Sequence, residues 1–482
     1  ISLNTTKLDI FFFTLLLLKY ILLFIFLVYN IYKDVIFMFN LSIITCKLVS
    51  KMSKLMGHDG SVIGGYYALK IDKNVLKKIK MPKHVIGITG SSGKGSTTEL
   101  VARILSKNGF KVVYNKNGSN VLNGLASLII NNTKKGKLDA DVLLMEMDER
   151  YMEGTLKNFD LTHLVVTNIT RDQPPRNLHP DFIKSVISKS VKDKVHLIIN
   201  ADDPLVKALS INHKGKLTTY GLDKNNYSVK SKLNNIDAQY CPICHSKLKY
   251  KFYQYGHIGC YKCPTGDFER GNVDFLAHNI NVTKGYIYIN KNKVHLPSNF
   301  LYSVYFVTAA YSLCSTLGIT NEDIIKVTND ETFKPKRLNV FNFFGRKWQM
   351  LASKNENNLS YKQSLDFIVN EKGIKTVVLG FDNSSRRYSE NDLSWIWDID
   401  FEELNNKTID KIVLVGRFKY DMLTRISYTG IPKSKIILIE DLDSELIPTL
   451  RKKTKGSIYS CVCFDKEIEL KAILKKEGIS NE

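Results

Sequence analysis

The residues with the clearest chemical potential are the glycines, lysine and hydroxyl side chains of the stretch HVIGITGSSGKGSTT, residues 84–98. A β-rich run comes first, then a Gly/Ser turn, then the lysine and hydroxyl residues that begin a predicted helix. Glycines let backbone N–H groups approach phosphate oxygens, and a lysine supplies positive charge for the β- and γ-phosphates. We therefore expect a phosphate loop that binds ATP or GTP through Gly90, Gly93, Lys94, Gly95, Ser96 and Thr97.

A magnesium site is expected beside this loop. Gly95 directly follows Lys94, where the usual loop has a Ser or Thr that ligates Mg²⁺, so Ser96 is the expected metal ligand and Thr97 the alternate. The run LLMEMDER ends a predicted strand with the carboxylate of Glu146. A carboxylate at that edge of a parallel sheet suits Mg²⁺. Ser96 and Glu146 are therefore the predicted magnesium ligands.

Two further strand ends carry polar groups. The strand VVTNIT ends at Asn168 and is followed by Arg171, and the motif NADDP begins at Asn200 after another apolar strand. Since the carboxyl ends of parallel strands meet at one edge, we expect Asn200 near the nucleotide. Solvated polar strand ends are the alternative interpretation.

Four of the eight cysteines have the spacing of a metal site. Cys241 and Cys244 form one C-x-x-C pair, and Cys260 and Cys263 form a second pair fifteen residues later. Two such knuckles can close a tetrahedral Cys₄ zinc site, and a closed site is structural rather than catalytic. We expect a zinc ribbon at about residues 238–272, with His257 as a loop residue and not a ligand.

The alternation of strands and helices predicts an α/β fold with a mostly parallel, doubly wound sheet over residues 84–333. A lead-in over residues 38–83 precedes it. After a linker at 334–337, a second α/β domain is expected over 338–482. The latter holds DLSWIWDIDFEEL, where two tryptophans stand among acids. That segment predicts either a partner surface with a catalytic carboxylate, or a buried tryptophan with solvated acids.

At 482 residues with a net charge of +22, the chain is long enough for about three domains and favours an anionic partner. An AT-rich coding sequence would produce the same abundance of Lys, Asn, Ile and Phe. Residues 10–32 are apolar enough to span a bilayer. We favour a native start at Met38, with residues 1–37 as translated upstream sequence; they form a membrane anchor only if they are genuine.

Several motifs, taken in their order, resemble the MurT branch of the Mur ligase family over roughly Met38 to the C-terminus. They are TGSSGKGST, NKNGSNVLNG, MEMDE, TNITRDQ, NADDP, CPIC with YGHIGCYKC, SKN, DLSWIWDIDFEEL and GRFKYDMLTRISYTGI. The resemblance implies a Mur-ligase-like ATPase domain with a zinc-ribbon insertion, followed by a Rossmann-like C-terminal domain.

The resemblance also implies an activity. Mur ligases phosphorylate a carboxylate with ATP and let an amine attack the acyl phosphate. MurT-type proteins amidate the α-carboxylate of D-glutamate in the lipid II stem peptide, with ammonia from a GatD-type glutaminase. The implied cofactors are ATP, Mg²⁺ and structural Zn²⁺, and the resemblance implies that Lys354 and Asn355 contact ATP. It also implies that an aspartate of this chain completes the Cys–His pair of the partner, and we choose Asp392 over Asp398 or Asp400. The implied location is cytoplasmic, at the inner face of the membrane.

Departures from the family pattern leave alternatives open. The loop reads GKGST, as in folylpolyglutamate synthases, and Cys260 takes the place of a ligand expected where Gly266 stands. Three alternatives remain: a folylpolyglutamate synthase or other amino-acid-adding ligase, a nucleic-acid-binding ATPase, and a subunit that binds the glutaminase without using ATP. The leading interpretation expects no nucleic acid as a partner.

Overall fold

The computed structural model describes residues 20, 35–116, 118–171, 179–230, 237–298, 300–330, 338–351, 358–382 and 393–479. Several predictions lie outside these residues. They are the apolar stretch at 10–32 apart from Tyr20, the linker at 334–337, Lys354, Asn355 and Asp392.

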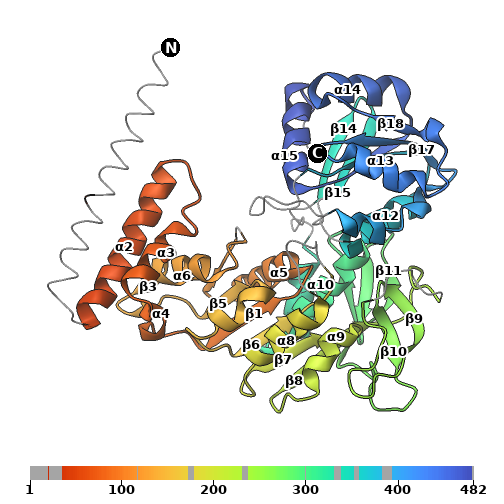
Figure 1. Cartoon of the computed structure of the whole chain (residues 1–482). Helices are drawn as coiled ribbons and strands as arrows, with labels where there is room; N and C mark the ends of the chain where they lie inside the picture. Colours follow the sequence, from red (N-terminus) through yellow and green to blue (C-terminus); the bar gives the residue numbers. More distant parts are fainter. Residues whose placement is uncertain are drawn as a thin grey trace.

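The larger of two main sheets has nine strands in the order β13-β12-β11-β8-β7-β6-β1-β5-β2 (Figure 1). Neighbouring strands from β11 to β2 pair in parallel, and β12 pairs antiparallel with both β11 and β13. The bounds are β1 (His84–Thr89), β2 (Val112–Tyr114), β5 (Val142–Glu146), β6 (His163–Val166), β7 (His196–Asn200), β8 (Leu217–Leu222), β11 (Phe275–Asn281), β12 (Tyr286–Ile289) and β13 (Asn292–His295). The expected α/β class with a mostly parallel sheet is confirmed.

Helices cover both faces of this sheet because its central strands are apolar on both sides. One face is packed by α5 (Lys94–Lys107), α10 (Leu301–Thr316) and α11 (Asn321–Thr328). The other is packed by α4 (Val75–Lys78), α6 (Leu122–Asn131), α7 (Met152–Thr155), α8 (Pro180–Ser190) and α9 (Pro204–Lys207). Strand β1 therefore lies in the middle of two cores and presents its carboxyl end, the phosphate loop, at the sheet edge.

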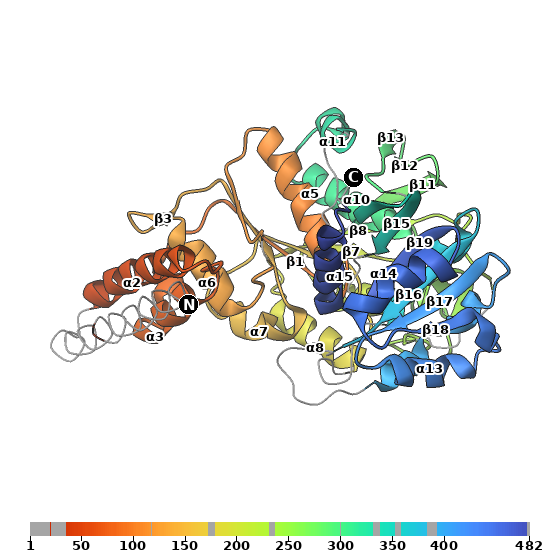
Figure 2. The same ribbon diagram turned by 90° about the horizontal axis from the view of Figure 1, so that it is seen from above.

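An N-terminal lobe of two helices packs against α6 at the end of the molecule far from the C-terminal domain (Figures 1 and 2). It consists of α2 (Val35–Leu55) and α3 (Ile63–Ile71). Within the described part of the chain, Ile36–Leu55 is the one helix that is long and apolar enough to cross a membrane. A small hairpin of β3 (Thr133–Lys134) and β4 (Lys137–Leu138) follows α6 in sequence.

A second small hairpin is inserted between β8 and β11. Its strands are β9 (Lys249–Tyr255) and β10 (Ile258–Lys262), and its own small core contains Cys241, Cys263 and Phe268. This is where the zinc ribbon was expected.

The C-terminal domain is built on a six-stranded sheet in the order β14-β15-β19-β16-β17-β18. Only β14 and β15 pair antiparallel; the other pairs are parallel. The strands are β14 (Leu338–Phe343), β15 (Arg346–Leu351), β16 (Lys375–Gly380), β17 (Ile409–Val415), β18 (Ile436–Leu438) and β19 (Ser457–Val462), and the helices are α12 (Asn358–Asn370), α13 (Lys419–Ser427), α14 (Leu442–Lys453) and α15 (Phe464–Lys476).

The segment with the tryptophans forms two short 3₁₀ turns, η3 (Ser394–Asp398) and η4 (Phe401–Leu404), against α12 and α13. Trp395 is buried, whereas Trp397 is 49% exposed. The interpretation as a buried tryptophan thus holds for Trp395, whereas the partner surface stays a prediction.

Candidate functional site

The phosphate loop runs from the end of β1 into α5, as the sequence predicts. Gly90 has a φ of 129°, and a Cβ at this position would clash with the side chain of Thr167 and the backbone of Asn168. Gly93 has a φ of 81° and forms the N-cap of α5. Both positions need glycine, and the resulting turn directs the amino end of a fourteen-residue helix toward the cavity beside it.

Lys94 is buried at the start of α5 and already has two partners. Its Nζ donates to the carbonyl of Gly90 and lies 2.9 Å from Oε2 of Glu149, which is also buried. Burial works against the charged form, but the carboxylates of Glu149, Glu146 and Asp148 together raise the pKa of Lys94. The ammonium group is therefore held charged among carboxylates at the mouth of the loop.

Asn168 fixes the shape of the loop from the neighbouring strand end. Its Oδ1 accepts hydrogen bonds from the backbone N–H (2.9 Å) and the hydroxyl (3.1 Å) of Ser92, and its Nδ2 donates to the Ser92 carbonyl (3.1 Å). Thr167 donates to the same carbonyl at 2.7 Å. The polar end of β6, noted in the sequence without a specific role, is thus a clamp on the loop.

Glu146 lines the cavity at the end of β5, as expected for a metal ligand. Asn115 exchanges two hydrogen bonds of 2.9 Å with the Glu146 backbone, and Asn120 donates to its carboxylate at 3.3 Å. Ser96 also lines the cavity, whereas the Thr97 hydroxyl donates to the Gly93 carbonyl at 2.9 Å. Ser96 is accordingly better placed than Thr97 to offer an oxygen to a cation opposite Glu146.

The cavity encloses about 800 Å³ of space that is open to solvent. One side consists of the phosphate loop, Glu146 and Asn168. The opposite side is aromatic and comes from α10 and nearby strands, with Gln363 added from α12 of the C-terminal domain; its members are Tyr220, Tyr255, Tyr302, Tyr305, Phe306 and Gln363. A polar end and an aromatic end in one cleft suit a ligand with phosphates and a flat ring.

Asn200 does not line this cavity, so its predicted direct contact with the nucleotide is corrected. The side chain is fully buried; it donates to the Thr167 carbonyl at 3.0 Å and accepts from the Asp202 N–H at 3.1 Å. Because Asn200 and Thr167 end adjacent strands, the amide joins the two strand ends. Asn200 therefore supports the site from behind.

The remainder of the NADDP motif links the inserted hairpin to the phosphate loop. Asp203 accepts hydrogen bonds from the N–H groups of Leu205 (2.9 Å) and Ile169 (2.8 Å), the residue after Asn168. His257, in the turn between β9 and β10, places Nε2 3.3 Å from Oδ1 of the same carboxylate, the oxygen that also accepts from Leu205. This contact is an ion pair without the alignment of a hydrogen bond, and despite burial, Asp203 raises the pKa of His257.

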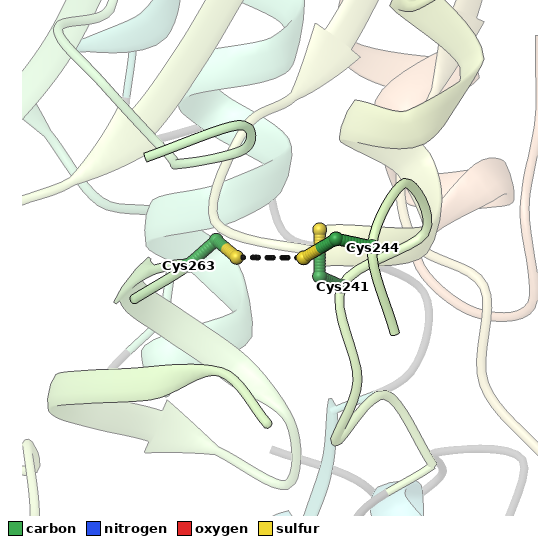
Figure 3. Close-up of side chains that lie close together, drawn as sticks. All are labelled: Cys241, Cys244 and Cys263. Atoms are coloured by element: carbon green, nitrogen blue, oxygen red, sulfur yellow. Dashed lines mark hydrogen bonds between the residues drawn. The ribbon is translucent and has the colours of Figure 1, made fainter. Parts of the chain in front are cut away.

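Three of the four predicted zinc ligands lie together (Figure 3). The sulfur atoms of Cys241, Cys244 and Cys263 lie within 4.8 Å of one another, and the Cys244–Cys263 pair is 3.3 Å apart. The N–H of Ile243 points at Cys241 Sγ (3.4 Å). Hydrogen bonds from Ser246 and Thr265 lower the pKa of Cys244 to about 7. Three thiols, one poised to ionise, match the donor type that zinc prefers.

Cys260 does not belong to this cluster, which corrects the prediction of a Cys₄ site. Cys263 follows the end of β10 at Lys262, and its sulfur joins the cluster next to Thr265. Cys260 lies within β10 beside Arg270, and burial raises the pKa of its thiol. The position nearest the three thiols is taken by Thr265, whose hydroxyl contacts Cys263 Sγ (2.9 Å) and Asp267 (2.7 Å).

The acidic tryptophan segment faces the central domain at one point and solvent at another. Asp398 lies 3.4 Å from Arg171, which also pairs with Asp237 at 3.1 Å. Trp397 packs edge-on against Tyr428 (5.5 Å between ring centroids) and below the guanidinium of Arg425 (5.7 Å). Asp398 is thus engaged within the chain, while Trp397 and the 72% exposed Tyr428 form an aromatic patch.

Comparison with known proteins gives two family matches that follow the two sheets. Residues 88–258 match the Mur ligase middle domain, and residues 355–463 match the MurT ligase C-terminal domain. The first contains the phosphate loop and two of the three clustered cysteines, Cys241 and Cys244, and the second contains the tryptophan segment.

Full-length relatives and solved structures agree with these matches. The chain is 28% identical over 411 residues to the MurT subunit of lipid II isoglutaminyl synthase (glutamine-hydrolyzing) of Staphylococcus aureus strain N315, covering 84% of this chain and 91% of that protein. It is 24% identical over 435 residues to the subunit of the same name from Streptococcus pneumoniae strain R6 (87% and 93% covered). Its fold resembles that of a pseudomurein peptide ligase type C from Methanothermus fervidus, with a TM-score of 0.64, 21% identity and 83% and 80% of the two chains covered.

Proposed function

We propose that this chain, a ligase that resembles the MurT subunits over most of its length, uses ATP to amidate the D-glutamate α-carboxylate of the lipid II stem peptide. The observation that carries the proposal is the cavity at the end of β1, where Lys94, Glu146 and Ser96 face an aromatic wall. Its product would be D-isoglutamine within a peptidoglycan precursor.

The reaction proceeds in two steps, phosphorylation of the carboxylate and attack of ammonia on the acyl phosphate. A carboxylate oxygen of the substrate attacks the γ-phosphorus of ATP, the bond to the β-phosphate oxygen breaks, and ADP leaves. Ammonia then attacks the carbonyl carbon of the acyl phosphate, inorganic phosphate leaves with one of the original carboxylate oxygens, and the nitrogen loses a proton. The protein's task is to place these groups in line and to balance the negative charge that develops.

The residues of the cavity fit this task. Lys94 and the amides of the loop balance phosphate charge, and the Glu149 carboxylate keeps the Lys94 ammonium group charged. Asn168 keeps the loop in the conformation that presents its amides. Tyr302 and Phe306 offer the surface for a nucleobase.

Ser96 and Glu146 would hold Mg²⁺, which when bound neutralises charge on the β- and γ-phosphates. A hydroxyl oxygen and a carboxylate oxygen are ligand types that this cation prefers. Cys241, Cys244 and Cys263 would hold a structural zinc ion, with the region of Thr265 and Asp267 at the fourth position.

Ammonia would come from a glutaminase of the GatD type that binds the C-terminal domain. Trp397 and Tyr428 form the aromatic patch expected of an interface anchor. Asp392, just before this patch in sequence, remains our choice for the residue that completes the partner's Cys–His pair. The engagement of Asp398 with Arg171 argues against that alternative.

The test is amidation of lipid II by the purified chain, first with ammonium chloride and then with glutamine and the glutaminase, followed by mass spectrometry. We expect amide formation that depends on ATP, and a loss of about 100-fold or more in Lys94→Ala. Unchanged amidation by Lys94→Ala, or activity that accepts an amino acid in place of ammonia, would contradict the proposal.

A further inference from the structure

Helix α2 exposes large aliphatic side chains that a helix on the surface of a water-soluble domain normally buries, although Phe39 and Ile43 pack against the core. The side chains that it buries are mostly small and polar: Ser42, Thr45, Cys46 and Ser50, with Val49. Large aliphatic side chains point outward instead, with Ile44 54% exposed, Leu48 51% and Leu55 79%. Surface helices normally place their apolar stripe against the core.

The buried face packs by close approach of small residues. A side chain at Gly64 of α3 would clash with Ser50 and with the backbone of Cys46, so the two helices approach through glycine. Polar bonds complete the contact: Ser127 accepts from the Gly65 N–H at 2.6 Å, and Asn131 donates to the Ser50 hydroxyl at 3.0 Å. Small residues and side-chain hydrogen bonds are the means by which helices associate where apolar surface faces lipid.

The outward residues form one stripe with a basic border. At about 100° per residue, Ile44, Leu48 and Leu55 fall within about 40° of one another around the helix. The exposed lysines Lys51 and Lys54 lie beside them, Lys47 donates through Nζ to the Thr133 carbonyl at 2.7 Å, and the helix VIFMFNLSIITCKLVSKMSKL has no acidic residue. Aliphatic side chains bordered by lysines suit the boundary between acyl chains and anionic headgroups.

The sequence on the amino side of α2 continues this character. Residues 10–32 read IFFFTLLLLKYILLFIFLVYNIY, only two residues before α2 begins. The chain as a whole carries +22 charges. Both features match an anionic bilayer better than they match a soluble protein partner, which would need complementary acidic groups at the basic border.

We propose that α2 docks on an anionic bilayer, with Ile44, Leu48 and Leu55 in the acyl boundary and Lys51 and Lys54 among the headgroups. The N-terminal lobe then attaches the ligase to the membrane surface, and the C-terminal domain, at the other end of the molecule, is free to bind a partner (Figures 1 and 2). This attachment does not depend on which carboxylate the ligase amidates.

The deciding experiment places a tryptophan on the stripe in the full chain. Leu48→Trp is compared with Ile468→Trp on α15, a position that is equally exposed at 50%. Each variant is mixed with vesicles of phosphatidylglycerol and brominated phosphatidylcholine, and the fluorescence lost to bromine is measured relative to the parent chain. Because quenching requires contact with acyl chains at the labelled position, it reports on α2 even if residues 10–32 also bind the vesicle.

We expect quenching of the added fluorescence in Leu48→Trp, and we expect this quenching to fall at least about threefold in vesicles without phosphatidylglycerol or when Lys51 and Lys54 are replaced by Gln. Ile468→Trp should match the parent. Quenching of Leu48→Trp no greater than that of the control overturns the proposal. A blue-shifted emission of Leu48→Trp in the absence of vesicles overturns the proposal as well, since the chain itself or a second copy then covers the stripe.

Discussion

Lys94 has its charge compensated by Glu149, in a pair whose two side chains are only 5% and 6% exposed. This contact joins residues fifty-five positions apart, so the phosphate-loop motif could predict the lysine but not its carboxylate partner. The same holds for Asn168, which was noted only as a polar strand end. A sequence motif defines what a loop can bind, whereas the side chains that hold the loop come from neighbouring strands.

Replacing Asn168 with Ala should loosen the phosphate loop, because three hydrogen bonds to Ser92 disappear together. We expect the KM for ATP to rise about tenfold and the free energy of unfolding to fall by about 1–2 kcal/mol. Steady-state kinetics and urea denaturation measure the two effects. Asn158→Ala, which removes an amide that bonds only to its own helical turn, is the matched control and should change neither.

His257 should make stability depend on pH. Its pKa is raised in the folded chain by Asp203, so its ion pair stabilises the fold fully below the ordinary histidine pKa of 6.5 and is lost as pH rises through the higher folded value. The variant His257→Gln should therefore be less stable than the parent at pH 5.5, by about 1–3 kcal/mol, with a smaller difference at pH 9. Thermal or urea unfolding across this range measures it; a difference independent of pH, or an equal effect in the exposed His58→Gln, would contradict the assignment.

At the scale of elements, the inserted hairpin is joined to the phosphate loop through His257 and Asp203, whose carboxylate also holds the backbone after Asn168. The sequence spacing correctly located the hairpin and three clustered thiols, whereas the metal itself stays a prediction. The spacing could not decide which cysteines cluster, because the C-x-x-C pattern does not show where a strand ends. Cys260 lies within β10, whereas Cys263 follows its last residue, Lys262.

Zinc content should distinguish the two cysteines. We expect Cys263→Ser to lower the zinc bound per chain, measured by atomic emission after dialysis, and to lower the melting temperature of the domain. Cys260→Ser should retain the parent's zinc. Equal loss in both variants would restore the Cys₄ prediction, and no zinc in the parent would remove the site altogether.

At the scale of the whole molecule, the alternation of strands and helices was enough to predict the α/β class and two successive sheets. It did not predict β19, the strand at the centre of the C-terminal sheet, because SIYSCV is a short mixed run whose partners β15 and β16 are distant in sequence. The lining of the cavity also depends on how the two domains pack, since Gln363 reaches it from the second domain. Such contacts arise from domain packing and leave no local pattern.

Partner binding should depend on the aromatic patch. We expect Trp397→Ala to weaken binding of the glutaminase about tenfold or more, since a half-exposed tryptophan beside an arginine is a typical interface anchor. Calorimetry or co-purification measures the loss. The control is Tyr420→Ala, which should leave binding intact. Tyr420 is a comparably exposed aromatic residue on α13, and its hydroxyl donates to the Glu440 carboxylate.

The most direct test of the central claim follows the oxygen atoms of the substrate. Lipid II labelled with ¹⁸O in the D-glutamate α-carboxylate is amidated by the chain with ATP and ammonia, and the inorganic phosphate is analysed by mass spectrometry. Carboxylate activation predicts one ¹⁸O in phosphate for each amide formed. Amide formation with unlabelled phosphate, or ATP hydrolysis without any amide, would contradict the account.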